Sequence, residues 1–303
     1  MAMRRSDFKR ELQEGLNTVF GLEYSRYPER YRQVFEVSNS RKAYEEDVLQ
    51  VGLGAAPVKQ EGEGVSYDQG SEGWMARYQH ETIALAFAIT EEAIEDNLYG
   101  DLGAKYSRAL ARSMQHTKEI KGAAVLNNGF TSGYTGGDGV VLFSASHPLI
   151  GGGTLSNTLS TPADLSETAL EAAVIQINGW TDDRGIPVDA KPIRLVIRQD
   201  NQFVAQRVLK SAQRSGTADN DVNALRALGM LQADAVVWTY LTDPDQWTLL
   251  TDVNDGLRHM VRKGMAKKVE GDFETGNMRY RARERYSFGW TDWRGAFSSA
   301  GSA

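Results

Sequence analysis

The chain lacks cysteine altogether, since none occurs among its 303 residues. Disulfide bonds, thiolate metal sites and cysteine nucleophiles are therefore excluded. Long apolar runs are also missing, because no stretch approaches the roughly 20 apolar residues of a membrane-spanning helix. The segment Met1–Leu12 carries charges but no apolar signal-peptide core. These absences favour a protein that is made and folded in the cytoplasm and stabilised by non-covalent packing.

A surplus of positive charge is missing as well. The 40 Asp and Glu residues outnumber the 34 Lys and Arg residues, which gives a net charge of -6. General polyanion binders usually neutralise many phosphates with excess Lys and Arg, so we expect packaged DNA to be at most a weak neighbour. What the chain does contain, 41% hydrophobic residues, is enough for a real core and predicts two lobes.

Motifs of enzymes are scarce. Ser144 and Ser146 stand near His147, which suggests a nucleophile and a base, but the chain has no G-x-S-x-G elbow. A loop whose turns are fixed by Pro148 and the glycines at 151–153 is the favoured interpretation. We expect no catalytic residue, no cofactor and no metal site.

Candidate ligands for metals or phosphates have simpler interpretations. The histidines lie far apart and lack a partner three or four residues away, which favours packing or surface roles for His80, His116, His147 and His259. The glycine pairs at 52–54 and 62–64 lack the remaining residues of a dinucleotide motif or a phosphate loop. The acidic turns at 182–183 and 243–245 could bind a cation, although Asx turns are commoner.

Apolar residues three or four positions apart predict one long helix over 101–128. Asp101 can cap its start, and left-handed residues within Asn127-Asn128-Gly129 can stop it. At about 1.5 Å per residue this spine helix would be roughly 40 Å long. Its buried face is predicted to carry Leu102, Tyr106, Leu110 and Met114.

The region before the spine helix divides into an arm and a hairpin. Residues 1–42 have helical spacing from Phe8 to Phe20, then read as an extended arm over 24–31, which could pack on its own body or on another subunit. Strands at 44–53 and 74–90 flank a glycine- and acid-rich centre and predict a long two-stranded hairpin. An isolated ribbon is marginal in water, so we expect the hairpin to rest on a partner.

After the spine helix the pattern predicts a second helix over 169–180, with Ser166 or Thr161 as its cap, and a lobe boundary at the turn 182–187. The segment 191–269 predicts a compact α/β lobe. Its expected elements are a strand at 193–197, a helix at 201–211, a loop at 213–221 and strands at 235–241 and 246–251.

The chain closes with a predicted strand over 278–290. Its apolar residues share one parity, and Arg279, Arg281, Arg283 and Arg285 share the other. This alternation is typical of a half-buried strand, here with a cationic outer face.

Several short motifs follow one another in a specific order that spans nearly the whole chain. They are the hairpin ending near Ala88-Ile-Thr, the block Leu142-Phe-Ser-Ala-Ser-His-Pro-Leu149 followed by Gly-Gly-Gly-Thr and Ser-Asn157, the helix start Asp164-Leu-Ser-Glu, the strand Pro192-Ile-Arg-Leu-Val-Ile197 and the end Trp290-Thr-Asp-Trp-Arg-Gly-Ala-Phe297. Each motif alone is weak, but their order resembles that of a tailed-phage major capsid protein. The relatives that it most resembles are major head subunits of Mu-like phages and prophages, in the Hong Kong ninety-seven fold.

The resemblance implies an α+β capsid fold with an N-arm, an extended E-loop hairpin, a P-domain that holds the spine helix, and an α/β A-domain at the capsomer centre. The implied boundaries are 1–42 for the N-arm, 43–89 for the E-loop, 90–185 for the P-domain, 186–263 for the A-domain and 264–303 for the return to the P-domain.

The function that the resemblance implies is structural. Such proteins form hexamers and pentamers that close into an icosahedral shell around phage DNA, after assembly in the cytoplasm of the bacterial host. The implied partners are further copies of the chain, a scaffold, a portal and a decoration protein, with no membrane. Some members join an E-loop lysine to an asparagine of the next subunit. Lys59 is the only lysine between Lys42 and Lys105, but no acceptor matches by motif, so we expect no cross-link.

Two charged segments predict a contact between subunits. Acidic residues crowd the hairpin at Glu61, Glu63, Asp68 and Glu72, and four arginines line the last strand at Arg279, Arg281, Arg283 and Arg285. We expect these segments to meet across subunits. Alternatively, the arginines face the packaged genome or pair with carboxylates of their own subunit. A hydrolase and a nucleic-acid binder remain the competing function classes.

Overall fold

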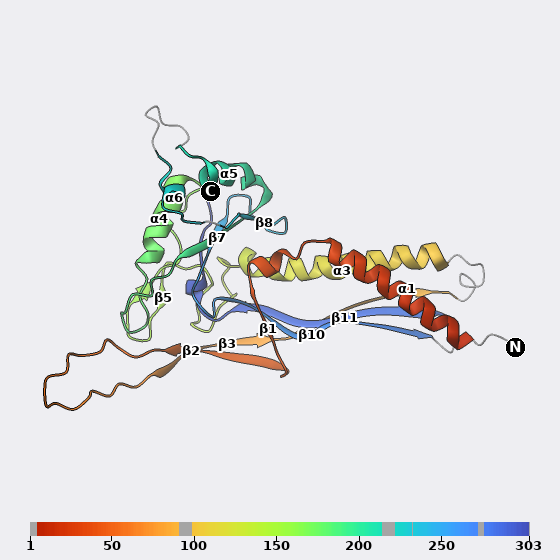
Figure 1. Ribbon diagram of the computed structural model, residues 1–303, viewed down its shortest axis with the longest axis horizontal. Coiled ribbons are helices and arrows are strands. Elements are labelled where there is room, and N and C mark those ends of the chain that lie inside the picture. The colour runs from red at the N-terminus through yellow and green to blue at the C-terminus, as the bar shows by residue number, and fades with distance from the viewer. Residues whose placement is uncertain (1–4, 91–98, 214–221, 232, 272–275, 303) are drawn as a thin grey trace.

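The computed structural model describes residues 5–90, 99–213, 222–231, 233–271 and 276–302. The body is elongated, with two long helices lying along two long strands (Figure 1). A lobe of shorter helices and strands stands at one end, and a hairpin projects from that same end. The two helices are α1 (Arg5–Arg26) and α3 (Tyr99–Asn127).

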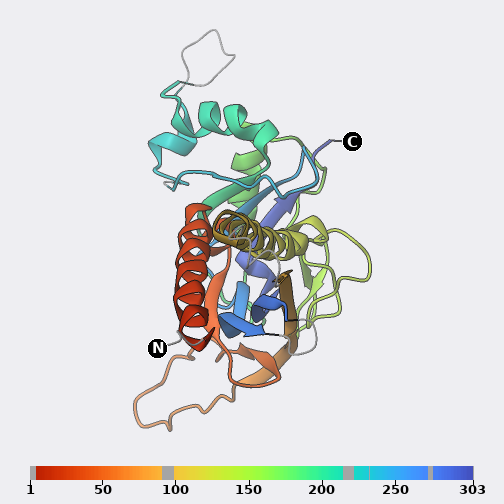
Figure 2. The same cartoon turned by 90° about the vertical axis from the view of Figure 1, so that its right-hand side faces the viewer.

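A four-stranded sheet forms the length of the body, with strand order β1-β10-β11-β4. The long strands β10 (Leu257–Gly271) and β11 (Met278–Trp290) are antiparallel. On their outer sides, β4 (Glu81–Ile89) pairs antiparallel with β11, and β1 (Glu36–Asn39) runs parallel to β10. The helices α1 and α3 lie side by side on one face of this sheet (Figure 2).

The predicted spine helix is present as α3, and Leu110 and Met114 are 3% and 2% exposed. Its predicted ends are wrong in detail. The helix already includes Tyr99, so Asp101 lies inside it rather than at its cap. No residue at 127–129 has a positive φ, and the helix ends instead where a Cβ on Gly129 would overlap the ring of Phe143.

The expected hairpin is shorter than predicted, because its second strand divides at His80. The hairpin pairs β2 (Tyr44–Val51) with β3 (Ser71–Gln79), whereas β4 leaves it to join β11. His80 marks the division, since its Nε2 lies 2.8 Å from Ser40 Oγ and its Nδ1 lies 3.0 Å from Ser287 Oγ. The buried imidazole fixes the chain at this point and directs β4 onto the body.

The lobe at the end of the body contains a second sheet, with strand order β12-β9-β7-β8. Its elements agree closely with the prediction for the first strand, the helix and the last strand of the segment. The lobe consists of α4 (Glu167–Asn178), β7 (Pro192–Ile197), η2 (Gln199–Asn201), α5 (Gln202–Lys210), α6 (Ala224–Ala227), β8 (Val236–Val237), β9 (Trp247–Thr251) and β12 (Ala296–Ser299). Ser166 caps α4 by accepting a hydrogen bond from the Ala169 amide. Most of the loop predicted at 213–221 lies outside the described residues.

The strand predicted at 235–241 is largely wrong, because β8 ends at Val237. The next residue, Trp238, turns toward α3, where its Nε1 donates a hydrogen bond of 2.6 Å to the Glu119 carboxylate. Glu119 also accepts a hydrogen bond from the amide of Arg30, in the short helix η1 (Arg30–Gln33). Burial raises the pKa of Glu119. One carboxylate on the spine helix thus ties the arm and the lobe to it.

The remaining short elements surround the junction between body and lobe. They are β5 (His147–Pro148), β6 (Thr154–Leu155) and η3 (Trp293–Gly295). Near this junction the backbones at Gly256 and Gly295 touch, and a Cβ on either residue would overlap the other. Glycine at both positions therefore permits η3 to lie directly against the start of β10.

The sequence left open whether the arm packs on its own body or on another subunit. In the described residues the arm packs on its own body. Leu16 and Phe20 of α1 are buried against the spine helix and β11, at 4% and 1% exposure. The helix continues through Tyr24 to Arg26, so the extended start predicted at residue 24 is wrong. Tyr24 lies stacked on Phe20, 5.9 Å between ring centroids, which favours continuing the helix.

A buried histidine in the body makes stability depend on pH. His259 stacks on Phe288 at 4.2 Å between ring centroids, and within the described part of the chain neither ring nitrogen has a hydrogen-bond partner. Burial, helped by the charges of Lys118 and Arg32, lowers the pKa of His259 from 6.5 to about 3. Between these values the unfolded chain binds a proton that the folded chain does not, so this residue's contribution to stability is present above pH 6.5 and is lost as the pH falls.

Replacing His259 with phenylalanine is therefore expected to stabilise the subunit in acid. At pH 5 the gain in unfolding free energy should be about 1 to 2 kcal/mol larger than at pH 8, because only the histidine chain takes up a proton on unfolding. Urea unfolding of the unassembled protein at both pH values measures this difference. Parallel pH profiles for His259→Phe and the parent would contradict it.

Candidate functional site

The arginine strand has the two faces that its alternation predicts. On β11, Tyr280, Ala282 and Tyr286 point into the core beneath the helices and are at most 2% exposed. Arg279 and Arg281 are exposed on the other face, and Arg283 and Arg285 are half-buried there. The face of the sheet away from the helices is therefore cationic, and we call it the arginine face.

The neighbours of these arginines on the arginine face are small or cationic, except that Glu270 of β10 stands opposite Arg279. Across β4, the register pairs the arginines in turn with Ala88, Ala86, Ala84 and Thr82. Across β10, Lys268 and Lys263 pair with Arg281 and Arg285. The Nε atoms of Arg283 and Arg285 are buried and have no hydrogen-bond partner among the described residues. Since a buried unmade hydrogen bond is unfavourable, this face is arranged for an acidic partner.

The acidic part of the hairpin lies at its exposed tip. Residues 61–70 are all exposed, and Glu61 sits in a turn closed by a hydrogen bond from the Glu63 amide to the Gln60 carbonyl. In the described residues Glu61, Glu63 and Glu72 form no ion pair. Figure 1 shows this loop projecting away from the rest of the chain. The carboxylates are thus presented outward.

Asp68 differs from the other hairpin carboxylates, because it is held within its own chain. It accepts a hydrogen bond of 2.7 Å from the Gly54 amide, and its Oδ1 lies 3.4 Å from Nη2 of Arg184. The hydrogen bonds from the Gly54 and Gln69 amides lower the pKa of Asp68, with a smaller contribution from Arg184. Asp68 therefore stabilises the base of the loop, a role that the sequence did not indicate.

The base of the hairpin is fixed to the body by a partly buried polar network that the sequence analysis missed. Asp47 of β2 forms an ion pair with Arg258 of β10 and accepts a hydrogen bond of 2.9 Å from Thr291. Tyr78 of β3 shares a hydrogen bond of 2.6 Å with the same threonine. These contacts hold the hairpin's direction, and the exposed residues 61–67 project beyond them.

The predicted buried face of the spine helix is described only in part. Leu110 and Met114 are buried, and the side chain of Leu102 lies outside the described residues. Tyr106 is 52% exposed, which contradicts its predicted burial. Its ring lies 5.8 Å from that of Phe87 on β4, at the edge of the sheet, where no further strand of the described chain covers it.

His147 has no ring nitrogen free to activate a serine. Its Nδ1 lies 2.6 Å from Asp138, and its Nε2 lies 3.1 Å from Oδ1 of Asn157. The amide of Asn157 is oriented by three backbone carbonyls that accept hydrogen bonds from its Nδ2, so Oδ1 must face the imidazole. Both ring nitrogens of His147 are therefore engaged, one by Asp138 and the other by Asn157.

The same histidine has a clear structural role. It is fully buried and stacks on Trp293 with 4.4 Å between ring centroids. The acidic turns are similarly structural, because Asp182 accepts from the amides of Arg184 and Ile186, and Asp243 accepts from that of Asp245. Within the described ranges, no group of three or more acidic or histidine side chains could hold a metal ion. No helix there is long and apolar enough to cross a bilayer.

Residues 75–299, from β3 to β12, match the family model described as phage capsid protein. The chain belongs to the phage capsid protein family. No curated protein matches the sequence of this capsid protein.

Several solved structures have a similar fold. The capsid of an empty GTA particle is 12% identical, with a TM-score of 0.55 over 91% of each chain. A phage-related protein from Bordetella bronchiseptica RB50 is 14% identical, with a TM-score of 0.52 over 93% of this chain and 95% of that one. The virus-like particle of Pyrococcus furiosus is 9% identical, with a TM-score of 0.50 over 94% of this chain and 98% of that one. These likenesses show the α+β phage-capsid fold.

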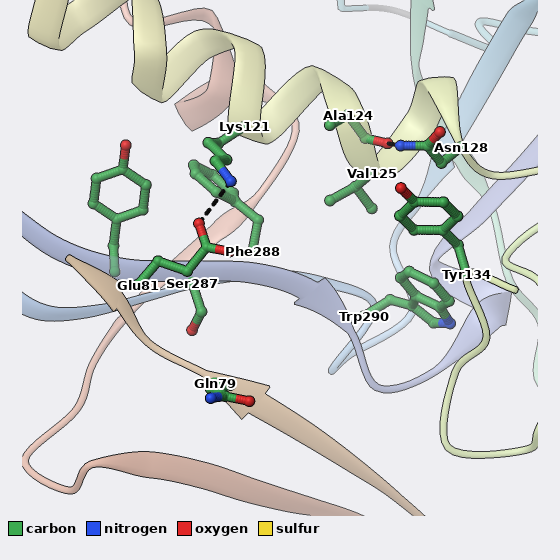
Figure 3. A pocket seen from close by; sticks show the side chains of 11 residues that line it. Gln79, Glu81, Lys121, Ala124, Val125, Asn128, Tyr134, Ser287, Phe288 and Trp290 are labelled. Atoms are coloured by element: carbon green, nitrogen blue, oxygen red, sulfur yellow. Dashed lines mark hydrogen bonds and ion pairs between the residues drawn. The ribbon is translucent and has the colours of Figure 1, made fainter. Parts of the chain in front are cut away.

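A cleft of about 250 Å³ lies on the body of the capsid protein, between α3 and the junction of β3 with β4 (Figure 3). Phe288, Trp290 and Tyr134 provide aromatic walls, and Lys121 forms an ion pair of 2.7 Å with Glu81. Figure 3 shows these two charged side chains pointing toward each other across the cleft. Because its walls are mostly aromatic, the cleft suits the packing of an apolar side chain.

Proposed function

We propose that this chain is the major subunit of a phage head and that its copies assemble through hexamers and pentamers into an icosahedral shell around DNA. The family match over 75–299 carries this proposal. The arginine face and the projecting acidic loop support it, because Glu61 and Glu63 are exposed and form no ion pair in the described residues, while the arginine face presents cationic side chains of the opposite sign. A relation to Mu-like head subunits is part of the proposal and rests on the order of the sequence motifs.

The proposal includes a division of the chain into working parts. We assign 1–42 to the N-arm, 43–89 to the E-loop, 90–185 and 264–303 to the P-domain, and 186–263 to the A-domain. The pairing of β12 with β9 means that the end of the chain also completes the sheet of the lobe. Scaffold, portal and decoration proteins are proposed partners, packaged DNA is a proposed weak neighbour, and the bacterial cytoplasm is the proposed place of assembly.

Electron microscopy of the purified protein tests the proposed function directly. Closed shells or rings of five and six subunits are the expected particles. A monodisperse monomer over a range of protein and salt concentrations would contradict self-assembly by this chain alone, and would require the same observation after co-expression with its neighbouring head proteins.

The charged segments give the proposal a more specific test. Reversing Glu61 and Glu63 to lysine is expected to leave the fold and thermal stability unchanged while blocking shell formation, because exposed charges contribute roughly 0 to 1 kcal/mol each but recur at every copy. Reversing Arg281 and Arg283 to glutamate in the same chain should restore part of the assembly. Light scattering at low and high salt, with electron microscopy of the products, measures both effects.

The matched control changes the net charge equally at exposed sites away from the hairpin. Glu14→Lys with Asp234→Lys is expected to assemble like the parent protein. Normal assembly of the hairpin variant at low salt would contradict the proposed contact. If the four-residue reversal restores nothing while the arginine reversal alone assembles and fails to retain DNA, the arginines face the genome instead.

A further inference from the structure

One edge of the four-stranded sheet is open for pairing. The strand β4 is the last in the order β1-β10-β11-β4, and no described strand pairs with its outer side. It pairs with β11 without a register shift from Glu81 to Ile89. Natural sheets usually block such an edge with proline, a bulge or several charges, but β4 has no proline and only Glu81 is charged. This edge therefore has the properties of a strand-binding site.

The two sides of this edge differ in chemistry. Toward the helices it exposes apolar surface, with Leu85 at 45% and Tyr106 at 52% exposure. Toward the arginine face it presents only the small side chains of Thr82, Ala84, Ala86 and Ala88. An added strand would lie about 10 Å from β11, two strand spacings away. The long arginine side chains of β11 can extend over the alanines toward that strand.

A segment of the hairpin tip has the matching alternation. Residues 64–70 form no helix or strand, and the backbone groups of residues 64–67 make no hydrogen bond within the described chain. Val65 and Tyr67 are 69% and 97% exposed, and they alternate with Ser66 and Asp68. In an extended strand, one face would be apolar and the other polar and acidic.

We propose that residues 64–67 of one copy add to the free edge of β4 in a second copy as a fifth strand. Val65 and Tyr67 then cover Leu85 and Tyr106, and Ser66 faces the arginine side, whereas Asp68 keeps its contacts with Gly54 and Arg184 in its own copy. A second copy is the occupant because the tip projects away from its own body and carries excess negative charge toward a cationic face. This inference rests on the proposed self-assembly.

Engineered disulfides test the pairing in assembled particles, since the natural chain has no cysteine to interfere. Ser66→Cys is combined in turn with cysteine at Thr82, Ala84, Ala86 and Ala88. Residues opposite each other in a sheet share a face, and a disulfide needs Cα atoms about 4.4 to 6.8 Å apart. We expect one of the four combinations to convert the monomer band into a ladder of multimers after mild oxidation and denaturing electrophoresis.

Side-chain parity supplies the matched control. Tyr67→Cys lies one residue away on the opposite face, so its combinations with the same four positions should form no ladder, whereas Tyr67→Cys with Leu85→Cys is available to link. Each single-cysteine chain is first shown by electron microscopy to form particles. If one of the four β4 variants does not form particles, the test rests on the other three positions.

The outcomes separate this inference from the proposed function. Particles without any ladder would overturn the β4 pairing but leave shell assembly intact. Equal linking of Ser66→Cys and Tyr67→Cys to the four tested positions of β4 would overturn it as well. The tip would then lie across the face of the sheet rather than along its edge. Absence of particles from the cysteine-free parent would contradict the proposed function itself.

Discussion

Replacing Leu110 with aspartate is expected to prevent the subunit from folding. Leu110 is 3% exposed on the spine helix, in the cluster that also holds Leu16, Phe20 and Tyr280. A carboxylate at this position would be buried without a cation, and burial of an unpaired ion costs several kcal/mol. Leu110→Ala removes only packing, at about 2 to 5 kcal/mol, so it should fold with a lowered melting temperature.

Tyr106 provides the matched control on the same helix. It precedes Leu110 by about one helical turn and is 52% exposed, so Tyr106→Asp is expected to yield soluble, folded protein. Circular dichroism and size-exclusion chromatography of the three variants measure the difference. Soluble, assembly-competent Leu110→Asp protein would show that the buried side of α3 is not the one described.

Replacing Lys118 with methionine is expected to destabilise the subunit by about 3 to 5 kcal/mol, because it leaves a carboxylate buried without its cation. The partner is Glu284, which is 2% exposed on the core side of β11. Tyr24 completes the group, since its hydroxyl donates to Glu284 over 3.1 Å and accepts from Lys118 over 2.6 Å. Burial, and then the charge of Glu284, raise the pKa of Tyr24.

A double-mutant cycle tests this expectation. Adding Glu284→Leu to Lys118→Met should recover much of the loss, because an apolar pair of similar volume leaves no buried charge. Lys121→Met is the control on the same helix, since its ion pair with Glu81 is exposed and contributes roughly 0 to 1 kcal/mol. Urea unfolding gives the four free energies. Additive losses at Lys118 and Glu284 would mean that the two charges do not stabilise each other.

The burial of Glu284 is a feature that the sequence could not predict. The alternation of β11 predicts its buried and exposed faces from local spacing alone, and the structure has both. Glu284 occupies a buried position in that pattern, and its burial depends on Lys118, which is distant in sequence. The division of the hairpin at His80 likewise depends on Ser40 and Ser287, so no local pattern could predict it.

In the candidate site, too, features within one short segment could be predicted, and contacts between distant segments could not. The charges of the hairpin tip and the last strand could be read from the sequence, because each lies within one short segment. The sequence could not show that Ala84, Ala86 and Ala88 of β4 lie beside the arginines, since β4 and β11 are far apart in the chain. Asp68 was misjudged for a related reason, because Arg184 approaches it only in the folded chain.

The pairing of β1 with β10 has a consequence for the order of events in the cell. Residues 36–39 find their partner strand only at 258–261, and α1 packs against residues of β11 that follow later still. A chain emerging from the ribosome can therefore pack α1 on α3 early, but β1 has no partner strand until residues 258–261 have been made. We expect the open edge of β4 and the arginine face to be completed only on released chains, so that nascent polypeptides cannot nucleate shells on polysomes.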